Sequence, residues 1–203
     1  NGLGVATIMA LLERTTIPHP ALEALFTIDE ETGMTGAMGL KGGVLKGDIL
    51  LNLDTEEDDE IGVGCAGGVD ITASRTYQEE AVATGKTGFK LTVNGLQGGH
   101  SGMDIIKGLG NANKFMNRFL LDGFENYGLQ IAEINGGGLR NAIPRESVAV
   151  FCIDEIHTEA FKADIAEFTE TLKEEYKTLE PNLKVTLEEA PLPEKVMNLG
   201  VQE

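Results

Sequence analysis

The sequence predicts an α/β domain over residues 1–67, followed by an α+β domain over residues 68–203. In the first part a helical segment and continuous apolar runs alternate, which is typical of a layer with a parallel sheet. In the second part apolar and polar residues alternate between two amphipathic helical segments, which is typical of an antiparallel sheet with one covered face. The change of pattern near Gly67 is the predicted domain boundary.

The first part contains the signals of one helix and two buried strands. Residues 3–14 are apolar on most faces of the helix that they predict, so we expect this helix to be buried. The proline-containing stretch that follows ends the helix. Continuous apolar runs at 21–28 and 48–53 each predict a buried strand of a parallel sheet.

Carboxylates follow both apolar runs. Asp29, Glu30 and Glu31 come directly after the first run, and Asp54 follows the second. Open α/β sheets bind ligands at the carboxyl ends of their strands, so we expect these side chains to converge there. Adjacent carboxylates at a buried strand end are costly unless a divalent cation neutralises them. The alternatives are therefore a metal site, with one Glu free to act as a base, or an exposed acidic turn.

The second part predicts the element order β-β-α-β-β-α-β, an α+β sandwich. The predicted strands span 69–73, 89–93, 129–134, 147–153 and 183–187, and the predicted helices span 111–121 and 158–179. The second helix is the clearest, because its apolar residues recur at steps of three and four. Gly123 is predicted to end the first helix.

Two glycine-rich loops of the second part carry side chains that could reach a ligand. His100 stands between glycines in the stretch 97–102, and an exposed flexible backbone would let it reach out. Arg140 and Asn141 follow three consecutive glycines and offer a guanidinium fork and an amide. The alternative for the second loop is a simple connection between two strands.

Composition excludes some classes of function. The net charge is −17, and such a surface repels the phosphate backbone of nucleic acids. No apolar run reaches the roughly 18 residues that predict a membrane span. Cys65 and Cys152 do not form a closely spaced pair, which argues against a thiolate metal site and fits a reducing compartment. We therefore expect a cytoplasmic protein that binds neither nucleic acid nor membrane.

Six motifs in compatible spacing resemble the two-zinc exopeptidases of the aminoacylase and carnosinase type. Within that group the similarity is greatest to the bacterial aminoacyl-histidine dipeptidases, and it runs from Asn1 to about Glu146. The motifs are Asn1-Gly2-Leu3-Gly4, Asp29-Glu30-Glu31-Thr32-Gly33, Asn52-Leu53-Asp54, Gly64-Cys65-Ala66-Gly67-Gly68, Gly98-Gly99-His100-Ser101-Gly102 and Leu139-Arg140-Asn141-Ala142-Ile143-Pro144.

The resemblance implies a role for each candidate residue. Glu30 would be the general base, and Glu31 and Asp54 would each bind one of two zinc ions, with manganese or cobalt as possible substitutes. His100 and Asn141 would hold the substrate's scissile carbonyl and carboxylate from a lid domain, with Arg140 a weaker candidate for the same task. The substrates would be dipeptides such as Xaa-His, and the lid would pair two copies into a homodimer.

The same resemblance implies that this chain is incomplete as an enzyme. The residues 1–67 would be part of a catalytic domain, and the residues 68–203 would be the lid. A bridging aspartate would directly precede Asn1, and the zinc-binding histidines would lie further upstream and downstream. Two alternatives stay open: a related amidohydrolase or tripeptidase with the same metal core, and a dimerisation module without catalytic activity.

The ligand count predicts that the isolated chain binds zinc weakly and does not hydrolyse dipeptides. Glu31 and Asp54 are two carboxylates, whereas a stable zinc site takes several protein ligands in fixed geometry, usually including imidazoles. Calorimetric titration with zinc and an assay on a dipeptide ending in histidine measure both properties. Submicromolar binding at two sites, or measurable hydrolysis, would show that the ligands have been assigned wrongly.

Overall fold

The structure, a computed structural model, describes residues 2–54, 59–64, 67, 69 and 71–202. Residues 55–58, and Cys65, Ala66 and Gly68 of the motif at 64–68, therefore lie outside the described residues. The chain divides into two compact units, Asn1–Ile71 and Thr72–Glu203. The predicted boundary at Gly67 falls shortly before this division. Each unit is described by itself below.

The first unit contains two helices, α1 (Gly2–Glu13) and the short α2 (Thr35–Met38), in its described part. The helix predicted at 3–14 is confirmed, but its predicted burial is wrong: α1 has no buried residue, and Leu3 is 84% exposed. The strands predicted at 21–28 and 48–53 are also wrong, because both runs are irregular. A buried parallel strand needs paired neighbours and covered faces, and the described residues of this unit supply no strand to pair with.

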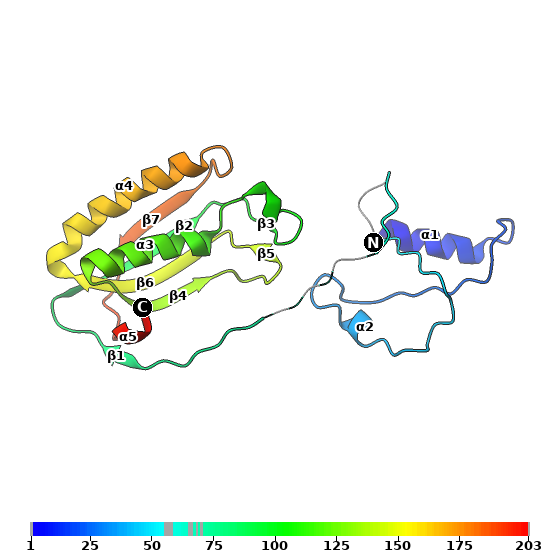
Figure 1. Cartoon of the computed structure of the whole chain (residues 1–203), viewed down its shortest axis with the longest axis horizontal. Helices are drawn as coiled ribbons and strands as arrows, with labels where there is room; N and C mark the ends of the chain where they lie inside the picture. Colours follow the sequence, from blue (N-terminus) through cyan, green and yellow to red (C-terminus); the bar gives the residue numbers. More distant parts are fainter. Residues whose placement is uncertain (1, 55–58, 65–66, 68, 70, 203) are drawn as a thin grey trace. The chain divides into compact units, whose positions relative to one another are not determined.

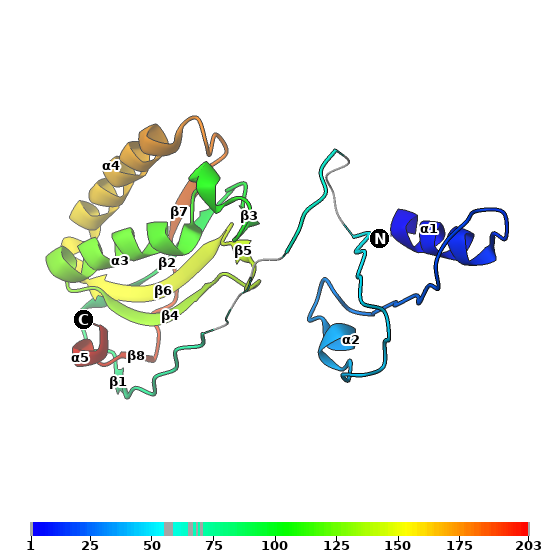
Figure 2. The same ribbon diagram turned by 45° about the vertical axis from the view of Figure 1, so that its right-hand side comes forward.

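The second unit is built on a four-stranded antiparallel sheet in the order β4-β6-β2-β7 (Figure 1). Its strands are β2 (Lys86–Asn94), β4 (Gln130–Gly136), β6 (Ser147–Asp154) and β7 (Lys184–Glu189). Helices α3 (Ala112–Tyr127) and α4 (Thr158–Tyr176) run along one face (Figure 2). Both predicted helices and four of the predicted strands coincide with these elements.

The predicted strand at 69–73 is wrong, since residues 71–78 form no strand. The chain instead makes β1 (Glu79–Ala81), which pairs with β8 (Lys195–Met197) in a separate two-stranded sheet. A third small sheet joins β3 (Gly99–His100) and β5 (Ala142–Ile143). The remaining elements are the 3-10 helices η1 (Ile105–Lys107) and η2 (Glu155–His157) and the helix α5 (Leu199–Gln202). Such short elements carry too few residues to show a periodic pattern.

The core lies between the sheet and the two helices. Alternate residues of β2, Phe89, Leu91 and Val93, are completely buried, as strict alternation in a sheet with one covered face requires. From α4, Phe161 enters this layer with its ring centroid 5.9 Å from Phe89 and 5.7 Å from Phe151. Tilted and edge-on ring pairs add to the free energy of burial. Aromatic packing therefore joins α4 to the middle of the sheet.

Helix α3 has a side-chain cap at its N-terminus and a glycine cap at its C-terminus. Its N-cap is Asn111, whose side-chain oxygen accepts hydrogen bonds from the backbone N–H groups of Asn113 and Lys114 at 3.0 and 3.2 Å. The predicted stop at Gly123 is wrong: the helix continues to Tyr127, and its C-cap Gly128 has the left-handed conformation (φ 62°) that favours glycine. A Cβ atom at Gly123 would lie 2.5 Å from Cδ1 of Leu129, so this glycine serves packing inside the helix.

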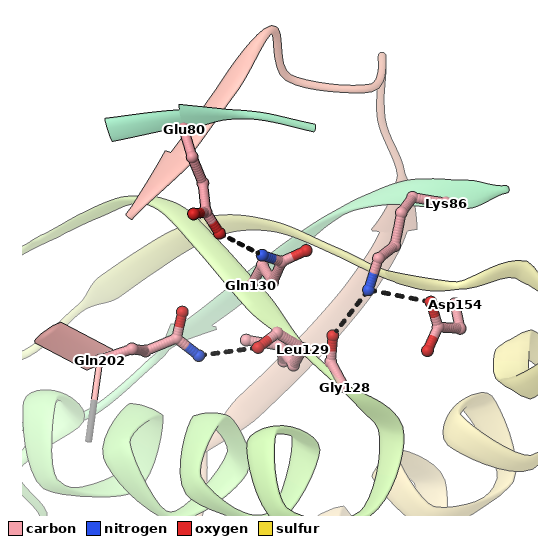
Figure 3. Close-up of polar contacts among 7 residues, drawn as sticks. All are labelled: Glu80, Lys86, Gly128, Leu129, Gln130, Asp154 and Gln202. Carbon is pink, nitrogen blue, oxygen red and sulfur yellow. Dashed lines mark hydrogen bonds and ion pairs between the residues drawn. The ribbon is translucent and has the colours of Figure 1, made fainter. Parts of the chain in front are cut away.

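Polar contacts fasten the two ends of the second unit to strand β4 (Figure 3). The Gln130 side chain donates to Glu80 of β1 at 3.0 Å. From α5, the Gln202 amide donates to the Leu129 carbonyl at 2.7 Å and accepts from the Ile131 N–H at 2.9 Å. Gln202 thus satisfies backbone groups at and directly before the start of β4, much as a neighbouring strand would. None of the helices among the described residues is long and apolar enough to cross a membrane.

We predict that Phe161→Ala lowers the free energy of unfolding by about 3–5 kcal/mol, because it removes a buried ring and leaves a cavity among Phe89, Phe151 and Tyr127. Urea denaturation followed by far-UV circular dichroism measures the change. The control is Leu121→Ala on the exposed side of α3, with an expected change within about 0.5 kcal/mol. Equal effects of the two substitutions would contradict the described core.

Candidate functional site

The two glycine-rich loops that the sequence singled out lie side by side in the second unit. Strand β3 pairs with β5 in antiparallel register, with His100 opposite Ala142. The N–H of Ser101 also donates to the carbonyl of Asn141 at 2.8 Å. His100 and Asn141 are both exposed and come from segments about forty residues apart. Arg140 is exposed directly before Asn141, so the structure brings the three predicted substrate-binding residues to one place.

The imidazole of His100 is held by the turn that follows it. The backbone N–H groups of Gly102 and Met103 donate to Nδ1 of the ring at 3.0 and 3.3 Å. The N–H of His100 itself donates to Oδ2 of Asp104 at 2.7 Å. In return the N–H of Asp104 donates to the His100 carbonyl at 2.9 Å. Two backbone hydrogen bonds therefore hold the ring at Nδ1, and the Asp104 carboxylate holds the backbone from which the ring extends. None of the hydrogen bonds among the described residues uses Nε2.

The glycines before His100 are needed for close packing. A Cβ atom at Gly99 would lie 2.8 Å from Cβ of Asp104, and one at Gly98 would lie 2.3 Å from Cγ of Arg145. Gly98 also has a positive φ of 67°, which favours glycine. The sequence interpretation attributed these glycines to a flexible backbone that exposes the histidine. The structure gives them a different role, since a side chain at either position would push the loop away from its neighbours.

Glu180 is a residue of this region that sequence reasoning missed. It is only 2% exposed, and its carboxylate accepts hydrogen bonds from the N–H groups of Gln97 at 2.8 Å and Gly110 at 2.7 Å. Gln97 opens the loop that carries His100, and Gly110 lies just before α3. A buried carboxylate is costly unless it is hydrogen-bonded, so this one fixes both loops. The sequence offered no signal for it, because Glu180 stands with Pro181 where the helix was expected to end.

The glycine run before Arg140 also packs against protein atoms. Cβ atoms at Gly136 and Gly137 would lie 2.2 and 2.9 Å from the side-chain amide of Asn113 in α3. Gly138, by contrast, has no neighbour within 4 Å. Two of the three glycines therefore let the first turn of α3 approach the loop, and only the third lies in open space. The turn that presents Arg140 and Asn141 is consequently anchored at its start.

In the first unit, the carboxylates Glu30 and Glu31 lie on a tight turn. Asp29 has a positive φ of 61°, its Oδ2 accepts from the Thr35 hydroxyl at 2.8 Å, and its carbonyl accepts from the N–H of Met34 at 2.6 Å. Asp29 is thus used to hold the turn. Glu30 and Glu31 are exposed at the tip, and neither makes a hydrogen bond or ion pair with the residues that the structure describes.

Asp54 is exposed at the end of the second apolar run, and its backbone N–H donates to the Asn52 side chain at 3.1 Å. Carboxylate oxygens are suitable ligands for a divalent cation. The described residues, however, contain no group of three or more His, Cys, Asp or Glu side chains placed to hold a metal ion. Glu31 and Asp54 could therefore serve only as part of a larger ligand set, and their assignment stays a prediction.

Two surface pockets of the second unit lie elsewhere. One of about 400 Å³ lies between α4 and β7, where Lys162 and Glu189 line it. Another of about 470 Å³ is lined by Glu133, Glu146 and Val148 beside the glycine run. Neither is lined by a predicted site residue. The candidate site is instead defined by the convergence of the His100 and Asn141 loops, which strand pairing and a backbone hydrogen bond hold together.

Residues 84–180 match the family of peptidase dimerisation domains of the M20 type. That range contains β2, α3, β4, β6 and α4 and ends at Glu180. This part of the fold is therefore similar to a peptidase dimerisation domain.

The chain as a whole resembles particular dipeptidases. It is 46% identical over 188 residues to the cytosol non-specific dipeptidase of Escherichia coli (strain K12), a match that covers 93% of the chain and 39% of the relative. The crystal structure of the aminoacylhistidine dipeptidase from Vibrio alginolyticus superimposes with a TM-score of 0.73 at 41% identity, covering 98% of the chain and 40% of the relative. The resemblance to the aminoacyl-histidine dipeptidases is confirmed, and the chain spans about two fifths of the length of these relatives.

We predict that Glu180→Gln lowers the free energy of unfolding by about 1–3 kcal/mol. Glutamine keeps the shape of the side chain but replaces one of the two carboxylate oxygens with an NH2 group. That group faces a backbone N–H and cannot accept its hydrogen bond. Urea denaturation measures the loss. The matched control is Glu170→Gln on α4, which breaks an exposed ion pair with Lys173 and is expected to cost at most about 1 kcal/mol. If Glu180→Gln lowers the free energy of unfolding no more than Glu170→Gln does, Glu180 does not fix the two loops.

Proposed function

We propose that the protein to which this chain belongs hydrolyses dipeptides at a two-metal site. The observation that carries the proposal is the 46% identity to a dipeptidase over 188 residues, a span that takes in 93% of the chain. The first unit would be part of the catalytic domain and supply carboxylates. The second unit would be the lid that holds the substrate. The described geometry supports the proposal, since His100 and Asn141 meet in the second unit while Glu30 and Glu31 stand exposed on an ordered turn.

In this proposal the carboxylates of the first unit have two different roles, metal binding and proton transfer. Glu31 and Asp54 would each bind one metal ion, zinc by preference, with manganese or cobalt as alternatives. When bound, such ions polarise the peptide carbonyl and lower the pKa of a bound water toward about 7. Glu30 would take the proton of the attacking water and pass it to the leaving amine. The exposure of Glu30 beside Glu31 supports this division, because neighbouring side chains on a turn can face different partners.

The lid residues would hold the substrate in place. His100 would donate a hydrogen bond to the oxygen of the scissile carbonyl, where negative charge develops in the transition state. Asn141 and Arg140 would bind the terminal carboxylate of the dipeptide, since an amide donates to carboxylate oxygens and a guanidinium can do so at two points. The pairing of β3 with β5 supports this arrangement, because it keeps the two loops at a constant separation.

The second unit would also join two copies of the protein. Residues 84–180 match a dimerisation domain, which supports a homodimer formed through the lid. The E. coli relative is named as a cytosolic enzyme, and a cytoplasmic location is proposed for this protein on the same basis. Binding to nucleic acid or to membranes forms no part of the proposal.

We predict that, in the protein expressed from its complete reading frame, Glu30→Gln abolishes turnover of a dipeptide ending in histidine while the bound zinc is retained. The reason is that a base would be lost and a ligand would not. Glu31→Gln is the matched control, since the same isosteric change at a ligand should lower the zinc content as well. Steady-state kinetics and metal analysis of the dialysed proteins measure the two effects.

Three outcomes would count against the proposed function. If Glu30→Gln alone removes zinc, the roles of Glu30 and Glu31 are exchanged. If both variants keep full activity, the turn after the first apolar run is not part of the active site. If the complete protein hydrolyses no dipeptide, a module without catalytic activity is the better description of this chain.

A further inference from the structure

We propose that Asp104 is a positioning residue that fixes His100 as the neutral tautomer with its proton on Nε2. The inference rests on the proposed function, because it concerns how His100 would present a hydrogen bond to the substrate. It goes further by naming the group that orders the ring and the nitrogen that carries the proton.

The proton is assigned by the partners of Nδ1. The two groups at this nitrogen, the N–H of Gly102 and the N–H of Met103, are backbone donors and cannot accept. Nδ1 must therefore supply its lone pair, and in a neutral imidazole the proton then resides on Nε2. A Cβ atom at Gly102 would lie 3.3 Å from Nδ1 and Cε1, so the backbone here is close against the ring. The edge of the ring that carries Nε2 is left to meet a ligand.

Asp104 closes this turn through both its side chain and its backbone. Its Oδ2 accepts from the N–H of His100 at 2.7 Å, and its own N–H donates to the His100 carbonyl at 2.9 Å. Its Oδ1 lies 2.6 Å from Nζ of Lys107 in η1. The hydrogen bond from Lys107, followed by that from the backbone of His100, holds the pKa of Asp104 below its usual range, which keeps the carboxylate an acceptor. The side chain therefore joins β3 to η1 and sets the backbone from which the imidazole extends.

The chemical consequence concerns the kind of ligand atom that His100 can meet. A proton on Nε2 makes the exposed nitrogen a donor, which suits a carbonyl oxygen or the oxyanion that forms from it. The other tautomer would present a lone pair and would repel that oxygen. It would also place an N–H against two backbone N–H groups. The turn thus selects the tautomer that substrate stabilisation requires, and the ring meets its ligand already ordered.

The test is nitrogen NMR on the full 203-residue chain labelled with ¹⁵N-histidine, recorded about two pH units above the ordinary histidine pKa of ~6.5. The signals of His100 are assigned by their loss in His100→Gln. We expect a protonated Nε2 and an unprotonated Nδ1, which resonate far apart. Asp104→Ala should move both signals toward the averaged positions of an exposed ring. Asp104→Asn, which retains an acceptor for the His100 N–H, should restore the separation. A variant that fails to fold is recognised because the signals of all its histidines change, and not those of His100 alone.

Kinetics on the complete protein separate this inference from the proposed function. If both hold, Asp104→Ala lowers kcat/KM by about 10²-fold, mainly through kcat, and Asp104→Asn restores most of it. If His100→Ala leaves turnover intact while Asp104 still controls the tautomer, the inference stands and the substrate role of His100 fails. A proton on Nδ1 in the unaltered chain would overturn the inference, and so would a His100 signal pattern that Asp104→Ala leaves unchanged.

Discussion

The packing of α3 and α4 on one face of the four-stranded sheet is the interaction on which the rest of the second unit depends. Phe161 of α4 lies against Phe89 and Phe151 in neighbouring strands, and α3 contributes Phe115 and Phe119 to the same core. Burial of this apolar surface is the main source of stability. It also decides where the loops begin, because the stretch that carries His100 leaves β2 and the stretch that carries Asn141 connects β4 with β6. The candidate site is therefore held at one end of a rigid layer.

Hydrogen bonds to two carboxylates define the shape of these loops, whereas the core decides only where the loops begin. Glu180 is buried and joins the start of the His100 loop to the entry of α3, while Asp104 holds the turn that carries the imidazole. Loops at the surface have few apolar contacts, so their shape depends on how their backbone donors and acceptors are satisfied. Both acids serve this purpose without being candidate ligands or bases. The position of His100 therefore depends on two groups outside the set of candidate substrate-binding residues.

The two units differ in how well the sequence predicted their secondary structure. In the second unit, alternation along β2 and the apolar spacing of α4 predicted elements that the structure contains. In the first unit, the apolar runs at 21–28 and 48–53 predicted buried strands, yet Ile49 is 83% exposed and both runs are irregular. The local sequence pattern predicts a helix or strand correctly where the surfaces that pack against it lie in the same unit. A parallel strand depends on neighbours distant in sequence, and the described residues of the first unit do not include them.

By itself the sequence determined the antiparallel sheet with its two helices and drew attention to the candidate residues Glu30, Glu31, Asp54, His100, Arg140 and Asn141. Hydrophobic periodicity is a local property, and so is the order of short motifs, which is why both are legible in one chain. Only the tertiary structure decided that the His100 and Asn141 loops pair with each other, that Gly98 and Gly99 serve close packing, and that Glu180 and Asp104 fix the surrounding backbone. Those features come from hydrogen bonds and contacts between segments far apart in the chain or between side chains and turns, and their geometry exists only once the core has formed.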